Sequence, residues 1–231
     1  MFHRLRLLVG ERSGDLPDVG PVLERLQAFP FYHKQAVLAP GSVLVFLPEA
    51  AATLIQTVVT LFHGPGGRAG EPVGSGWRLR DNPHREGMPF GGLFDDTGSP
   101  SQVLDLADGA HSLASLGGEG HAWLRSFRDP PQRTFSNIVV EGSGDPRPDH
   151  GFLVSELRIL RLSDKRYLAV AHGNRLDGGA AAADGGRIRF TFNPWRIPAR
   201  ICGTSGQPRS TALGISTPEL VLEPGKSVHF L

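Results

Sequence analysis

The chain has 231 residues, with 24 Lys and Arg against 23 Asp and Glu, so its formal net charge is +1. This balance argues against a nucleic-acid-binding or membrane-surface protein, because both classes usually carry a surplus of basic residues. Hydrophobic residues make up 39% of the chain and charged residues 20%, a composition that can build a core.

Glycine and proline are frequent, with 30 and 19 residues, which is typical of short strands joined by turns rather than of a helical bundle. The predicted fold class is mainly β (α+β): an antiparallel β-sandwich, or a curved sheet or barrel, with one or two short helices. We expect a single β-rich domain over residues 1–231. It could divide into 1–63 and 101–231, joined by the Gly/Pro-rich region 64–100.

The N-terminal residues 1–8 show neither a continuous apolar run nor a cleavage site, so we predict no signal peptide. No run reaches the ~18 apolar residues of a membrane helix. We therefore expect a soluble protein that is cytoplasmic or part of an assembled particle. Cys202 is the single cysteine, and we expect it to be a small buried hydrophobe.

The first hundred residues contain a few clear elements. Alternation predicts a strand at 3–9, and apolar spacing with Pro21 in the first turn predicts a helix at 18–29. Two apolar runs flank Pro40 and Gly41, which predicts strands meeting at a type II turn. The β-branched residues at 53–62 favour a strand over a helix, although three preceding alanines leave a helix open. The Gly-rich stretch 64–100 reads as a functional loop system or a surface excursion.

The rest of the chain gives the clearest β pattern. Several elements are predicted in chain order: a strand at 101–106, a helix at 118–127, a strand at 135–141, a hairpin of 153–162 with 167–171, and a strand at 187–192. The Gly/Ala-rich stretch 178–186 reads as an exposed loop. Trp195 follows the best strand and is expected to close one end of the sheet. Residues 220–231 repeat the Pro-Gly turn, with Pro224 and Gly225 in the type II positions.

One stretch resembles SnoaL-like cone-fold proteins over roughly residues 93–200. The resemblance is carried by residues 116–127, 133–141, 144–145, 151–154 and 193–197. It implies a short helix, a Gly-Asp turn, long strands and a closing strand at 193–197. It also implies a pocket inside a curved sheet for a hydrophobic substrate, with a His or Asp as acid or base. The family's strand histidine falls on Arg133 or Thr134 here, and the first ninety residues lie outside the resemblance.

Two functions are compatible with these patterns. The leading hypothesis is a non-enzymatic β-rich binding or assembly protein, a subunit of a larger particle, with protein partners or self-association and with neither nucleic acid nor membrane. The alternative is a small-molecule lyase, cyclase or isomerase that holds a small apolar ligand. Its acid-base residues would come from His121, Asp145, His150 and His172. No two histidines have the spacing of a local metal motif, so neither a metal nor a cofactor is predicted.

Overall fold

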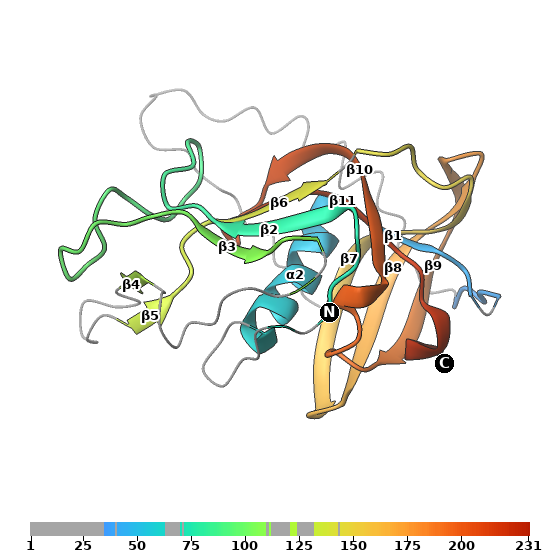
Figure 1. Cartoon of the computed structure of the whole chain (residues 1–231). Helices are drawn as coiled ribbons and strands as arrows, with labels where there is room; N and C mark the ends of the chain where they lie inside the picture. Colours follow the sequence, from blue (N-terminus) through green and yellow to red (C-terminus); the bar gives the residue numbers. More distant parts are fainter. Residues whose placement is uncertain are drawn as a thin grey trace, which may run out of the picture.

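The computed structural model describes residues 35–39, 41–62, 70, 72–109, 111, 121–123, 132–142 and 144–231. Within these ranges ten strands form one mixed, curved sheet in the order β12-β9-β8-β7-β1-β11-β6-β2-β3, with β10 paired to β11 (Figure 1). A separate ribbon pairs β4 with β5. The predicted mainly β class is confirmed, and the curved-sheet alternative describes it.

The elements have the following bounds. The strands are β1 (Leu44–Phe46), β2 (Trp77–Asp81), β3 (Leu104–Ala107), β4 (His121–Trp123), β5 (Gln132–Thr134), β6 (Ile138–Gly142), β7 (His150–Ser163), β8 (Arg166–Asp177), β9 (Ala180–Phe192), β10 (Ile201–Ser210), β11 (Ile215–Leu222) and β12 (Val228–Phe230). The helices are α2 (Pro48–Phe62) and the short 3-10 turns η1 (Pro198–Arg200) and η2 (Gly225–Ser227). None of the helices in the described ranges is both long and apolar enough to cross a membrane.

The strand predicted at 53–62 is wrong, because these residues belong to the helix α2. The helix opens with Pro48 in its first turn, where a missing N–H costs nothing, and Ala51 N donates to Leu47 O at 2.8 Å. The threonine hydroxyls inside α2 donate to main-chain carbonyls four residues back. One face is buried against the sheet, and this 3.6-residue period outweighs the β-branched composition. Its buried side chains include Ala51, Leu54, Ile55, Val58, Val59 and Phe62.

The predicted hairpin is confirmed as the long antiparallel pair β7–β8, whose register runs from His150 opposite Asp177 to Ser163 opposite Arg166. The exposed loop predicted at 178–186 is wrong beyond its first two residues. Gly178 and Gly179 have φ of 55° and 75°, the positive values of a two-residue type I′ turn. This turn brings the following residues back along β8, so the Gly/Ala-rich stretch joins β9 as an extended strand.

Other predictions are confirmed, corrected or outside the described residues. Strands β3 and β6 confirm those predicted at 101–106 and 135–141, whereas β2 lies unpredicted within 64–100. His121–Trp123 forms a strand where a helix was predicted. Pro224 has a helical ψ of −40°, so it begins η2 rather than a type II turn. The strand at 3–9 and the helix at 18–29 lie outside the described residues.

Cys202 also differs from its prediction, because the residue is exposed in β10 rather than buried. Its Sγ lies 3.4 Å from Val221 O. Partial burial of the sulfur and the nearby Glu223 carboxylate raise the pKa of the thiol. This is the reverse of the lowered thiol pKa of a nucleophilic cysteine.

The core lies between α2 and the inner face of the sheet. Trp77, Phe46, Phe62 and Phe152 are its largest fully buried side chains. Trp195 packs on Phe62, with ring centroids 5.2 Å apart, and so closes the C-terminal end of the helix against the sheet. One face of β7–β9 is not covered by this packing and faces solvent. Most of the segment between β2 and β3 is also exposed to solvent.

Candidate functional site

The structure places the four predicted acid-base residues at separate points of the fold. His121 begins β4. Asp145 is exposed in the connection from β6 to β7, and His150 is exposed as the first residue of β7. His172 is half-buried in β8 opposite Glu156, six residues along β7 from His150, which corresponds to about 20 Å. The structure therefore does not bring His150 and His172 together, and the catalytic roles stay a prediction.

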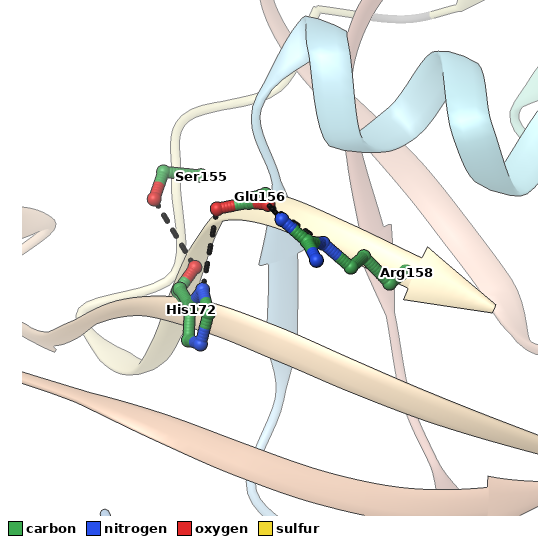
Figure 2. A network of polar contacts seen from close by, with 4 residues as sticks. All are labelled: Ser155, Glu156, Arg158 and His172. Carbon is green, nitrogen blue, oxygen red and sulfur yellow. Dashed lines mark hydrogen bonds and ion pairs between the residues drawn. The ribbon is translucent and has the colours of Figure 1, made fainter. Parts of the chain in front are cut away.

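His172 takes part in a polar network on the solvent-facing side of β7 and β8 (Figure 2). Its Nδ1 lies 3.2 Å from Glu156 Oε2. The other carboxylate oxygen of Glu156 accepts hydrogen bonds from Arg158 Nε at 3.0 Å and from Nη2 at 2.9 Å. The Glu156 carboxylate thus links His172 on β8 to Arg158 on β7, the strand that carries Glu156 itself.

The network contains Ser155, Glu156 and His172, which are the residue types of a catalytic triad, but not its geometry. The Ser155 hydroxyl donates to the main-chain oxygen of His172 at 3.1 Å, and Figure 2 shows it directed at that carbonyl. A triad instead needs the serine hydroxyl hydrogen-bonded to the imidazole. The register shift between Val154 and Glu156 is the local cause, because it leaves Ser155 as the extra residue of a β-bulge.

The electrostatics of Glu156 are those of a structural carboxylate. Partial burial pushes its pKa upward, but the hydrogen bonds from His172 and Arg158 outweigh burial and hold the pKa below its usual value. The ionised form therefore persists at neutral pH and cross-links β7 to β8. Sequence alternation could place these residues on one sheet face, but the bulge that sets their register has no local sequence signal.

The segment 82–103 between β2 and β3 forms a second feature, which we call the arm. Its turn is held by Asp95 Oδ1, which accepts from Thr97 N at 2.9 Å and from Ser99 N at 3.0 Å. Ser101 N donates to Leu93 O at 2.9 Å and closes the base of this turn. Figure 1 shows the arm as green loops that extend from the end of β2, away from the long strands β7–β9.

The arm is fastened to the body of the protein by buried polar groups. Asp81, the last residue of β2, is fully buried and accepts hydrogen bonds from Ser136 N and Asn137 N, each at 3.0 Å. Asn137 Oδ1 in turn accepts from Phe90 N at 3.0 Å. Since Asp81 and Asn137 are both buried, the chain at Phe90 has a defined position relative to the sheet.

Four large apolar side chains of the arm face solvent. Phe90 is 52% exposed, Leu93 72%, Phe94 59% and Val103 47%. Scattered exposed apolar residues are normal on a protein surface, but here four of them lie within one segment of 14 residues, 90–103. The Gly-rich composition of 64–100 predicted a functional loop system or a surface excursion, whereas the exposure of these side chains depends on tertiary structure.

Two pockets in the described part of the chain lie at the tip of the β7–β8 hairpin. They have volumes of about 420 Å³ and about 630 Å³ and share Lys165, Asn193 and Arg196 on their walls. None of the four predicted acid-base residues lines either pocket. Their walls carry charge, unlike the apolar pocket that the enzyme hypothesis anticipates.

Comparison with solved structures identifies proteins with the same fold. A candidate modulator of DNA gyrase from Bacteroides thetaiotaomicron VPI-5482 matches with a TM-score of 0.68 and 18% identity over 91% of this chain and 51% of that chain. TldE from Thermococcus kodakarensis matches with a TM-score of 0.70 and 20% identity, over 92% and 55%. A candidate modulator of a DNA gyrase from Thermotoga maritima MSB8 matches with a TM-score of 0.62 and 14% identity, over 85% and 51%.

These identities show a shared fold, and the chain spans about half the length of the solved structures it matches. No protein-family model and no curated protein matches the chain. The SnoaL-like resemblance over 93–200 is wrong, since the structures that match most of the chain are of another kind. The fold gives the reason: β1 lies between β7 and β11, and α2 packs on them, yet both precede residue 93. Residues 193–197 also form a turn rather than a closing strand.

Proposed function

We propose that this chain is a non-enzymatic binding protein that assembles with further protein chains, a second copy of itself being the first partner to test. The arm is the contact surface. The observation that carries this proposal is the exposure of Phe90, Leu93, Phe94 and Val103 on a segment that its own hydrogen bonds hold in place.

A surface that is already ordered loses little conformational entropy when it binds a partner. A flexible loop would lose conformational entropy on docking, whereas the arm is held by Asp95 and Asn137 before any partner arrives. The free energy gained by burying the exposed aromatic and leucine side chains is then not offset by the cost of ordering the arm. Two proteins that share the fold are candidate modulators of DNA gyrase, and a role that works by binding agrees with this proposal.

The gain available at the tip of the arm can be estimated from two residues. Complete burial of a Leu or Phe side chain is worth roughly 1.5–3 kcal/mol. Leu93 is 72% exposed and Phe94 is 59% exposed, and a partner could bury this remaining surface. Together they would contribute about 3 kcal/mol per arm, which corresponds to about a 100-fold change in dissociation constant.

Native mass spectrometry over a range of concentrations tests the proposal. The wild-type chain should form a discrete oligomer, and the Leu93→Ser/Phe94→Ser variant should need at least about 100-fold higher concentration to do so, since each interface loses one or two arms. The matched control is Leu160→Ser/Leu162→Ser, which removes two leucines that are 57% and 55% exposed on β7. A wild-type monomer at every concentration would refute self-assembly. Loss of the oligomer in the control alone would move the contact from the arm to β7.

A further inference from the structure

Three cationic side chains gather at the far end of the long hairpin. Lys165 belongs to the turn between β7 and β8, Arg166 is the first residue of β8, and Arg196 belongs to the turn that follows β9. All three are exposed, and within the described residues none of them forms an ion pair. The acid in this turn, Asp164, is already paired with Arg161. We call this end of the hairpin the basic tip.

Both pockets are lined by Lys165 and Arg196 of the basic tip. The first, of about 420 Å³, adds Arg166, Thr191 and His229 to the shared wall, and its lining contains no Asp or Glu. The second, of about 630 Å³, adds Leu61, Trp195 and the Arg161–Asp164 pair. Each volume lies within the roughly 300–1,000 Å³ of pockets that hold organic ligands, so a small inorganic ion would leave most of the space unfilled.

The apolar wall of the second pocket is fixed in place. Trp195 Nε1 donates to Asp164 O at 3.0 Å, and the indole packs on Phe62 with a ring-centroid distance of 5.2 Å. Two hydrogen bonds to Asn193 also fix this turn. Arg196 N donates to Asn193 O at 3.0 Å, and Trp195 N donates to Asn193 Oδ1 at 3.1 Å. A rigid aromatic surface therefore lies beside cations that have no ion-pair partner among the residues that the structure describes.

We propose that the basic tip binds an acidic peptide segment of a protein partner. Carboxylate side chains of the segment pair with Lys165, Arg166 and Arg196, and an apolar side chain between them packs against Trp195. Charge complementarity selects the anionic partner, and the aromatic wall selects one that also carries apolar groups. A nucleic acid fits less well, because the chain has a net charge of only +1 and this cluster contains three cations rather than a basic stripe.

This site is separate from the arm, so the two proposals can fail independently. The arm joins β2 to β3, whereas the basic tip belongs to β7, β8 and the turn after β9. Variants of the tip should leave the oligomer seen by mass spectrometry unchanged. Variants of the arm should leave peptide binding unchanged.

Fluorescence anisotropy with a labelled peptide of alternating glutamate and leucine tests this proposal directly. The peptide should bind the wild-type chain, and the same peptide with glutamine in place of glutamate should bind at least tenfold more weakly. Lys165→Ala/Arg196→Ala should weaken binding of the acidic peptide about tenfold, since each exposed pair contributes up to roughly a factor of five. Raising the salt concentration should weaken it further.

The matched control is Arg78→Ala/Arg209→Ala, which removes two exposed cations elsewhere in the sheet and should leave the affinity unchanged. Thermal unfolding of both double variants checks that they fold like the wild type. Equal binding by the tip and control variants would overturn the proposal, as would no binding to the wild type. A labelled single-stranded DNA that binds through the tip more tightly than the peptide would also overturn it, and would assign the site to nucleic acid.

Discussion

Replacing Gly173 by Ala tests how closely β8 approaches β7, on which the polar network and the basic tip both depend. A Cβ built on Gly173 would lie 1.9 Å from Leu153 O, 2.8 Å from Leu153 C and 2.9 Å from Phe152 Cε1. Two of these atoms are main chain of the neighbouring strand, so no side-chain rotation can make room. The two strands must separate locally, and the hydrogen bonds between them must lengthen.

The size of the effect follows from two opposing contributions. Overpacking of this kind costs typically about 1–3 kcal/mol, and a main-chain obstacle places it near the upper end. Alanine recovers about 0.7 kcal/mol, because glycine has the greater conformational entropy in the unfolded chain. The net loss is about 2 kcal/mol, which lowers the unfolding temperature of a chain of this length by roughly 4–8 °C.

Thermal unfolding followed by circular dichroism or calorimetry measures this loss. The control is Gly203→Ala in β10, where the nearest atom to a built Cβ is Asp145 Oδ2 at an ordinary 3.7 Å. This substitution should leave the unfolding temperature within about 2 °C of the wild type, since no atom has to move. If Gly173→Ala unfolded at the same temperature as Gly203→Ala, the close approach of β7 and β8 would be refuted.

The remaining predictions concern the polar network and the arm. Glu156→Gln should destabilise the protein at neutral pH by less than about 1 kcal/mol, because the carboxylate is partly exposed and solvent screens it. Since folding lowers the pKa of Glu156, this difference should be present above the carboxyl's ordinary pKa and disappear as the pH falls through the lowered value, as measured by urea unfolding at several pH values. An equal difference at all pH values would contradict the assigned ion pairing. Asp95→Ala should speed hydrogen exchange at the amides of Thr97 and Ser99 without lowering global stability by more than about 1 kcal/mol, because it removes only the acceptor of an exposed turn. Unchanged exchange at both amides would show that Asp95 does not hold the arm.

Local alternation was sufficient to predict the long hairpin and the strand at 187–192. It failed at α2, where β-branched residues favour a strand locally but one buried face per helical turn decides the outcome. It failed again at 180–186, because a Gly/Ala-rich stretch extends only when a neighbouring strand offers hydrogen-bond partners. Both errors arise from tertiary contacts outweighing intrinsic preference.

The candidate surfaces were less predictable than the fold. The Gly-rich region around the arm was predicted to be a functional loop system or a surface excursion, but the sequence did not show whether Leu93 and Phe94 are exposed or belong to the core. Lys165 was expected in a turn, whereas Arg196 lies 31 residues later and joins it only because β9 returns along β8. His172 was proposed as an acid-base residue, and that role stays a prediction. Its pairing with Glu156 could not be predicted, since the bulge at Ser155 sets their register.

Hydrogen–deuterium exchange tests, without any substitution, whether the chain assembles through the arm. Exchange is measured at a concentration where the oligomer forms and again after dilution to the monomer. We expect slower exchange in the assembled state at residues 90–103, with little change at the tip turn 163–166. Equal exchange of the arm in both states, or protection confined to β7–β9, would contradict it.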